Sequence, residues 1–194
     1  MNTKFTYQGR KYPYHPNLST ARAVELPLAM EVMERFKGCR ILEVGNVLSN
    51  HFEGMTHAVV DKYQGPIKQD IVDYTAPTYD LVISISTIEH IGFDEHRYAG
   101  YPVVQEPCKF VLALGRLKDL GSELFCTWPM SYNLNLDVWT LARSRSLFDD
   151  ISFMKRVSRS NRWEEAGWED AYEAKYNQPF PRANVIVIAR LKNV

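Results

Sequence analysis

The feature that most constrains the fold is a short apolar stretch, residues 41–44, that contains one acid and is followed directly by a glycine. Ile41, Leu42 and Val44 form an apolar run typical of a buried strand. Glu43 lies within this run and needs a partner, because burying an unpaired carboxylate is costly. Gly45 supplies a backbone that can turn tightly and come close to a ligand. We therefore predict a buried strand whose carboxyl end opens onto a binding site.

Further apolar stretches continue this pattern along the chain. The most apolar and β-branched of them, residues 79–86, predicts a central strand of a parallel sheet. The predicted strands cover residues 40–44, 57–60, 67–71, 79–86, 123–128, 151–157 and 185–190. The first predicted helix runs from a cap at Asn17 or Ser19 to about Lys37, with a break or kink near Leu26 because of Pro27. Two further helices are predicted over residues 102–120 and 137–146. This alternation predicts an α/β fold, a Rossmann-like doubly wound and mostly parallel sheet with an antiparallel edge strand and helices on both faces.

Length and charge narrow the classes of partner. We expect the 194 residues to form a single domain, with residues 1–37 as an N-terminal arm and helix and residues 38–194 as the α/β core. The formal net charge is zero, so no overall field favours a nucleic acid or an anionic membrane as partner. We find neither an apolar run of the roughly 18 to 20 residues that span a membrane nor a signal-peptide core. These features predict a cytoplasmic protein and leave its oligomeric state open.

Polar residues gather where the predicted strands end. Asp61 closes the second strand, 18 residues beyond Glu43, and an acid at this position typically accepts hydrogen bonds from ribose hydroxyls. Asp70 stands near the end of the third strand. The end of the fourth strand carries Ser84, Ser86, Thr87, Glu89 and His90. In a doubly wound sheet, ligands bind beyond the carboxyl ends of the strands, so we expect these residues to share one site.

The turn after the first strand indicates the kind of cofactor. A dinucleotide needs Gly-x-Gly-x-x-Gly there, because its pyrophosphate must touch bare backbone at a helix N-terminus. Residues 45–49 read Gly-Asn-Val-Leu-Ser and contain one glycine, and no Gly-x-x-x-x-Gly-Lys phosphate loop follows. The site thus has acids that can bind a ribose but no turn that can bind a phosphate. Such a site suits a nucleoside that lacks phosphates, such as S-adenosylmethionine.

At these residues the chain resembles the class I S-adenosylmethionine-dependent methyltransferases. Glu43-Val44-Gly45 is similar to the first motif of that family, Asp61 to its ribose acid, and residues 83–91 to its fourth-strand motif, although Val47 and Ser49 replace glycines usual in the first motif. Residues 22–27 and 179–184 are similar to a bacterial branch found near polysaccharide or natural-product gene sets.

The resemblance implies roles for individual residues. It places Glu43 and Gly45 under the methionine part of the cofactor, Asp61 at the ribose and Asp70 with Ile71 at the adenine. The strand end at residues 84–87 would line the methionine side, and Arg22 would pair with the cofactor carboxylate. The expected cofactor-binding residues are Arg22, Glu43, Gly45, Asn46, Asp61, Lys62, Asp70, Ile71, Ser84, Ser86 and Thr87.

His90 is the candidate catalytic residue, because methyl transfer to an oxygen or nitrogen that must lose a proton benefits from a base near neutral pKa. The alternative is a histidine that packs against or caps the following helix. The other histidines lack a second residue at metal-ligand spacing, so we predict no metal. The acceptor is expected against aromatic and amide side chains, which suit a sugar or a phenolic ring, although core packing explains the tryptophans equally well. The expected acceptor-binding residues are Tyr14, Trp128, Tyr132, Asn133 and Trp163.

The leading hypothesis is therefore a methyltransferase that acts on an oxygen or nitrogen of a small molecule, sugar or glycan. A non-catalytic binding module with a methyltransferase-like fold and a nicotinamide-dependent oxidoreductase are the alternatives. The first hypothesis expects Glu43 and Asp61 to flank one crevice.

Overall fold

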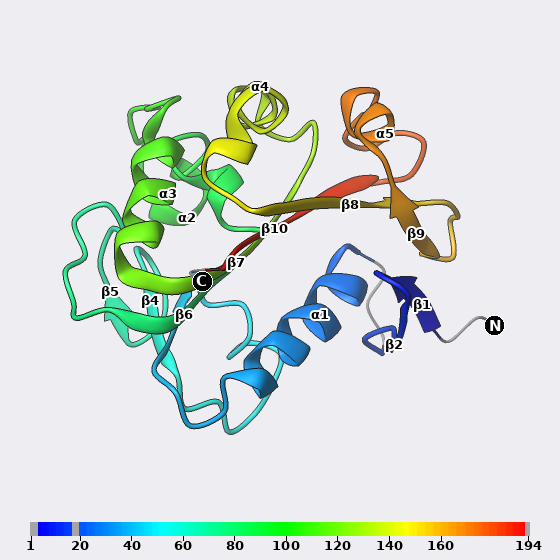
Figure 1. The fold of residues 1–194 in the computed structure, drawn as a ribbon. Helices are drawn as coiled ribbons and strands as arrows, with labels where there is room; N and C mark the ends of the chain where they lie inside the picture. Colours follow the sequence, from blue (N-terminus) through cyan, green and yellow to red (C-terminus); the bar gives the residue numbers. More distant parts are fainter. Residues whose placement is uncertain (1–3, 17–19, 193–194) are drawn as a thin grey trace.

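The computed structural model describes residues 4–16 and 20–192, and its centre is a sheet of eight strands (Figure 1). The strands of this sheet are β3 (Ile41–Val44), β4 (Ala58–Asp61), β5 (Ile67–Lys68), β6 (Tyr79–Ile85), β7 (Gly121–Pro129), β8 (Asp150–Arg156), β9 (Trp163–Ala166) and β10 (Val185–Lys192). Their order across the sheet is β5-β4-β3-β6-β7-β10-β8-β9. The predicted strands at residues 40–44, 57–60, 79–86, 123–128, 151–157 and 185–190 are thereby confirmed to within a few residues.

The direction of the strands confirms the predicted fold class. The five strands from β5 to β7 pair in parallel, whereas β10, β8 and β9 each pair antiparallel with their neighbours. From β3 the chain moves outward to β5 and then crosses to β6 on the other side of β3. The strand order thus reverses between β3 and β6, the place where open α/β sheets bind ligands.

Helices cover both faces of the sheet. They are α1 (Arg22–Arg35), η1 (Ile88–His90), α2 (His96–Ala99), α3 (Lys109–Leu120), α4 (Leu134–Arg143), η2 (Ser144–Ser146) and α5 (Trp168–Tyr172). Figure 1 shows α1 on one face and α3, α4 and α5 on the other. Side chains of β6 alternate between the two cores, with Leu81 and Ile83 toward α1 and Val82 toward α3, as successive residues of a strand do. In the described part of the chain no helix is long and apolar enough to cross a membrane.

The N-terminal residues depart from the prediction of an irregular arm. Residues 4–13 form a hairpin of β1 (Lys4–Tyr7) and β2 (Arg10–Pro13). The two residues that connect the strands, Gln8 and Gly9, both have positive φ, at 47° and 72°. A two-residue loop of this kind suits the twist of a hairpin. The buried side chains of Phe5 and Tyr7 join the same core as α1.

Helix α1 also differs from its predicted extent. The predicted caps Asn17 and Ser19 lie outside the described residues. The helix continues through Pro27, so it has no break near Leu26, one of the two outcomes that we expected there. A proline cannot donate to the carbonyl four residues earlier. Here that carbonyl belongs to Ala23 and accepts a hydrogen bond from the backbone N–H of His15, at 2.9 Å. His15, in the segment before α1, therefore donates the hydrogen bond that Pro27 cannot give to the Ala23 carbonyl.

The polar and aromatic stretch at residues 161–176 carries elements that we did not predict. It contains the edge strand β9 and helix α5. Trp163 is buried, whereas Glu164 and Glu165 are exposed. The single apolar side chain at the start of this strand explains why the pattern predicted no strand. Charged residues of this kind are common on edge strands, where they discourage pairing with another chain.

Candidate active site

A pocket lies at the carboxyl ends of β3, β4 and β6, where the strand order reverses. Arg22, the first residue of α1, and Tyr98 of α2 contribute to its walls. The predicted site residues that line it are Arg22, Gly45, Asn46, Asp61, Lys62, Asp70, Ile71, Ser86, Thr87 and His90. Residues from five separate segments of the chain thus reach one pocket at the position that the fold favours for ligands.

Gly45 closes the floor of the pocket against Thr87. Its φ of +88° is a conformation that residues with a Cβ rarely adopt. A Cβ at this position would lie 2.1 Å from the Thr87 hydroxyl oxygen. The glycine is therefore required both by its backbone conformation and by the close approach of the loop after β6.

Glu43 does not reach the pocket, which corrects the expectation that it flanks the ligand. Its side chain is fully buried. One carboxylate oxygen accepts hydrogen bonds from the backbone N–H groups of Val47, at 2.7 Å, and Leu48, at 2.6 Å. The other oxygen lies 2.7 Å from Nε2 of His57. Glu43 therefore holds the loop at Val47 and Leu48 in place from the side that faces away from the pocket.

Ser84 is likewise placed away from the pocket, contrary to its predicted role. It is fully buried, and its hydroxyl donates to the carbonyl of Val44 on the neighbouring strand, at 3.2 Å. The residues of this strand end that line the pocket are Ser86 and Thr87, and the Ser86 hydroxyl donates to Glu25 at 2.6 Å. In a continuous strand Ser84 and Ser86 would point the same way. Because β6 ends at Ile85 and Ser86 has a positive φ of 39°, the two side chains differ in direction.

Asp61 lines the pocket and holds the loop that follows β4. Its Oδ1 accepts hydrogen bonds from the backbone N–H groups of Tyr63, at 2.8 Å, and Gln64, at 2.7 Å. Its Oδ2 accepts only a longer bond, of 3.3 Å, from the N–H of Asn46. A carboxylate oxygen has room for more than one donor. Oδ2 is therefore placed to accept a hydroxyl from a ligand in the pocket.

Asp70 stands in a network of charges on the same side of the pocket. Its Oδ2 lies 3.1 Å from the Lys62 ammonium and 2.7 Å from that of Lys109. Lys62 also pairs with Glu95, which accepts a further hydrogen bond from the Tyr63 hydroxyl at 2.8 Å. Burial would raise the pKa of Asp70, but the bonds from the two lysines outweigh it and lower the pKa. The carboxylate thus stays ionised and fixed in place.

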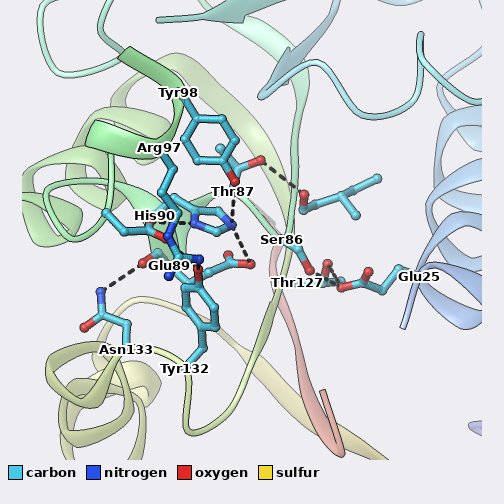
Figure 2. A network of polar contacts seen from close by, with 12 residues as sticks. Glu25, Ser86, Thr87, Glu89, His90, Arg97, Tyr98, Thr127, Tyr132 and Asn133 are labelled. Carbon is cyan, nitrogen blue, oxygen red and sulfur yellow. Dashed lines mark hydrogen bonds and ion pairs between the residues drawn. The ribbon is translucent and has the colours of Figure 1, made fainter. Parts of the chain in front are cut away.

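The first turn of α1 is tied to the ends of β6 and β7 by a buried carboxylate. Glu25 is fully buried and accepts hydrogen bonds from the hydroxyls of Ser86, at 2.6 Å, and Thr127, at 2.8 Å (Figure 2). Its second oxygen pairs with the Arg22 guanidinium at 2.8 Å. The burial of Glu25 shows that the pair positions Arg22 at the pocket, which a solvated surface pair would not do.

His90 faces the pocket and is hydrogen-bonded at both ring nitrogens (Figure 2). Nδ1 lies 2.7 Å from a carboxylate oxygen of Asp94, and Nε2 lies 3.4 Å from the Tyr98 hydroxyl. Burial would lower the pKa of His90, but the hydrogen bond to Asp94 and the charge of Glu89 outweigh it and raise the pKa. Because Nδ1 donates to Asp94, the neutral ring leaves Nε2 free to accept a proton. Sequence reasoning missed Asp94, although its position four residues after His90 was a usable signal.

The acid next to His90 is buried and short of partners. Glu89 Oε1 lies 3.7 Å from Nε2 of His90, and Oε2 has no hydrogen-bond partner among the described residues. The side chain is 2% exposed. Burial raises the pKa of Glu89 to about 7. A carboxyl group in this state can be either neutral or charged near neutral pH, depending on what binds beside it.

The predicted acceptor-binding residues divide into one near the pocket and four elsewhere. The Tyr132 ring lies 5.1 Å from the His90 ring, and its hydroxyl donates to Asp94 at 2.5 Å. Trp128 and Trp163 are buried at 0% and 2% exposure, so the structure corrects their predicted contact with an acceptor to core packing.

Tyr14 and Asn133 have structural partners as well. The Tyr14 hydroxyl accepts a hydrogen bond from the backbone N–H of Trp163, at 2.8 Å, away from the pocket. Asn133 is buried and caps α4 by accepting from the N–H groups of Asn135 and Leu136. Its amide nitrogen donates to the Glu89 carbonyl at 3.0 Å, so it supports η1 from behind. The prediction that Tyr14 and Asn133 contact the acceptor is therefore wrong, and both side chains instead hold neighbouring backbone in place.

The loop after β3 lacks the element that a dinucleotide requires. Residues 46–57 are all described and form turns and bends, with no helix. Pyrophosphate binding in doubly wound folds relies on the N–H groups and dipole of a helix that begins at this turn. This loop offers neither. In the described parts of the chain no three His, Cys, Asp or Glu side chains are grouped as metal ligands.

Comparison with known proteins gives distant matches of fold. No family model and no curated protein matches the chain. A protein of Pyrococcus horikoshii described as a candidate RNA methyltransferase aligns with 88% of this chain and 82% of its own, at 12% identity and a TM-score of 0.45. Magnesium protoporphyrin IX methyltransferase from Synechocystis PCC 6803, solved with bound S-adenosylmethionine, aligns over 84% and 75%, at 13% identity and a TM-score of 0.39.

A third match, an S-adenosylmethionine-dependent methyltransferase from Clostridium acetobutylicum, aligns with 85% of this chain and 89% of its own, at 10% identity and a TM-score of 0.40. The fold class is assigned from the strand order of this chain, which is that of a Rossmann-like, doubly wound sheet.

Proposed function

We propose that this protein is an S-adenosylmethionine-dependent methyltransferase that acts on an oxygen or nitrogen of a small molecule, sugar or glycan. The observation that carries the proposal is a nucleoside-type pocket without a phosphate site. Asp61 and Asp70 line the pocket, whereas the loop after Gly45 forms no helix. A ribose can be bound by such acids, and a pyrophosphate lacks its usual helix N-terminus there.

The alternatives are weaker for specific reasons. A nicotinamide-dependent oxidoreductase needs a dinucleotide site, and the turns at residues 46–57 do not supply one. A non-catalytic module would have no use for a histidine whose Nε2 faces the pocket while Nδ1 is held by a carboxylate. His90 and Asp94 form that arrangement, which suits a general base.

The chain's own residues divide the work between binding and proton transfer. S-adenosylmethionine supplies a methyl group activated by its sulfonium. Asp61 Oδ2 would accept a ribose hydroxyl, the loop at Asp70 and Ile71 would meet the adenine, and Arg22 would pair with the carboxylate of the cofactor. His90 Nε2 would take the proton that the acceptor loses, while Asp94 stabilises the imidazolium that forms.

The test is calorimetry of cofactor binding with two variants at Asp61. Asp61→Ala should weaken binding of S-adenosylhomocysteine by about 1 to 3 kcal/mol, the usual loss for a charge-assisted hydrogen bond. Asp61→Asn keeps an oxygen for the N–H groups of Tyr63 and Gln64 and so separates ribose binding from loop support. We expect both variants to bind more weakly than the wild type, with Asp61→Asn less affected. Absence of binding to the wild-type protein would refute the proposal.

A further inference from the structure

The carboxylate of Glu89 poses a problem that the proposed reaction alone does not solve. It is almost fully buried, and its Oε2 has no hydrogen-bond partner within the described residues. Figure 2 shows it between the His90 ring and the side chains of Ser86 and Thr127. An unpaired buried carboxylate is costly, so a native structure that keeps one usually gives it a partner in some functional state.

The nearby basic side chains are already paired with other acids. Arg22 pairs with Glu25, and Arg97 pairs with Asp94 at 3.3 Å. Lys62 and Lys109 both pair with Asp70. His90 comes within 3.7 Å of Glu89, beyond hydrogen-bond distance, and gives its short bond to Asp94. His90 therefore reaches Oε1 of Glu89 at ion-pair distance, whereas Oε2 has no hydrogen-bond partner among the described residues.

Tyrosine rings lie close to His90, the residue that follows Glu89. The Tyr132 and Tyr98 rings lie 5.1 Å and 5.3 Å from the His90 ring, and Tyr176 lies 4.9 Å from Tyr132. The faces of such rings attract cations through their quadrupole, most strongly when water is excluded. The Glu89 carboxylate and the tyrosine rings near His90 thus favour the same kind of ligand group.

The charged and titratable groups that act on Glu89 come from several elements. They are Arg22 and Glu25 of α1, His90 beside it, Tyr98 of α2, and Tyr176 after α5. Burial raises the pKa of Glu89 to about 7. A cation bound against the carboxylate would favour its charged form and so lower that pKa.

We propose that the acceptor atom is a basic amine nitrogen, and that Glu89 together with Tyr132 and Tyr176 binds it as an ammonium group beside Nε2 of His90. This inference rests on the proposed function and names the chemical class of its substrate. A neutral hydroxyl would not compensate the buried carboxylate as an ammonium group does. The site therefore discriminates amines from the corresponding alcohols.

The reaction follows from this placement. The ammonium nitrogen releases one proton to Nε2 of His90. With the freed electron pair it bonds the methyl carbon, whose former bonding pair leaves with the sulfur. The product is a methylated ammonium, which Glu89 still neutralises, and the proton leaves His90 for solvent.

The experiment measures binding, so it does not need the natural acceptor. Wild-type protein saturated with S-adenosylhomocysteine is titrated with phenethylammonium and with 2-phenylethanol. We expect the amine to bind at least tenfold more tightly than the alcohol. Glu89→Gln should weaken binding of the amine at least tenfold and leave the affinity for the alcohol unchanged. Equal affinities for the two probes, no measurable binding of the amine, or full amine affinity in Glu89→Gln would overturn the proposal.

A second variant covers the case in which Glu89→Gln does not fold. Tyr176→Leu removes an aromatic ring and should also weaken binding of the amine. Tyr172→Leu, whose side chain is 78% exposed on α5, is the matched control and should bind as the wild type does. Equal amine affinity in the Tyr176 and Tyr172 variants would remove the aromatic part of the proposal.

Two further titrations distinguish an ammonium group on the acceptor from the ammonium group of the cofactor. If Glu89 binds the ammonium group of the cofactor, Glu89→Gln will weaken binding of S-adenosylhomocysteine. Binding of 5′-methylthioadenosine, which lacks the amino acid end, will not change. That result would overturn the acceptor assignment. If S-adenosylhomocysteine does not bind the wild type, the proposed function fails, and the same titrations without it still show whether Glu89 binds an ammonium group.

Discussion

The two halves of the pocket differ in how completely their charges are paired. The adenosine half, at the ends of β4 and β5, contains Asp61, Lys62 and Asp70, and each has hydrogen bonds or ion pairs to protein groups. The reactive half, at η1, contains His90, whose Nε2 lies 3.4 Å from the Tyr98 hydroxyl. Next to His90 lies the buried Glu89, whose Oε2 has no hydrogen-bond partner among the described residues. Both halves are built on the carboxyl ends of parallel strands, yet only in the adenosine half does each named charged group have a protein partner.

This difference indicates what each half does. Paired charges hold a binding surface in one geometry before a ligand arrives, which lowers the entropy lost on binding. Groups with perturbed pKa values and missing partners gather where protons move. The following variants test whether the two halves can be changed independently, beginning with the largest expected effect.

His90→Ala should lower turnover by about 10²- to 10⁴-fold, the usual contribution of a general base. Because His90 makes no contact with the adenosine half, the dissociation constant for S-adenosylhomocysteine should stay the same. Turnover is measured as release of that product with an accepted substrate, and affinity by calorimetry. His96→Ala, at an exposed position in α2, is the control. An unaltered rate in His90→Ala would assign the histidine a structural role.

Gly45→Ala should destabilise the junction between the halves. The added Cβ would meet Thr87 at 2.1 Å, and the positive φ strains any L residue. We expect a loss of about 3 kcal/mol in the free energy of unfolding, the sum of αL strain and overpacking. Gly54→Ala has a similar φ of +74° with nothing within 4 Å, so it should lose only about 1 kcal/mol. Equal losses in chemical denaturation would show that contact with Thr87 is unimportant.

The ends of the strands could be predicted from sequence, and with them much of the pocket. Gly45, Asp61 and His90 each follow an apolar run, and the carboxyl ends of parallel strands meet at one edge. The sequence also predicted a mostly parallel sheet, because strands that alternate with helices are typical of such a sheet. The pattern of apolar runs in the sequence therefore predicts which residues stand at the carboxyl-terminal edge of the sheet.

The direction and partners of individual side chains were harder to predict. Glu43 stands at a strand end like Asp61, but His57 and the N–H groups of Val47 and Leu48 hold its carboxylate behind the loop. Trp128 stands at the end of the predicted strand at residues 123–128, yet its side chain turns into the core, where its Nε1 donates to the Thr140 hydroxyl at 3.1 Å. In both cases the deciding partners come from contacts that form only in the folded chain.

Glu43→Gln tests the structural role that the fold gives this acid. The amide can accept through one oxygen only, and its nitrogen would replace the oxygen that faces His57. We expect the free energy of unfolding to fall by about 1 to 3 kcal/mol, the cost of leaving a buried polar group without its partner. Glu53→Gln, on the exposed part of the same loop, should leave stability unchanged. A Glu43 variant as stable as this control would contradict the assignment.

Asp94→Asn should produce the smallest effect, a shift in the pH dependence of turnover. His90 acts as a base only when unprotonated, so turnover rises with pH through its pKa, which Asp94 helps to raise. Replacing the carboxylate by an amide removes the stabilisation of the imidazolium and lowers the pKa of His90. The acidic limb of kcat against pH should therefore move to lower pH. Asp119→Asn, at an exposed position of α3, should leave the limb in place. If Asp94→Asn also leaves the limb in place, Asp94 does not raise the pKa of His90 and its assigned role is wrong.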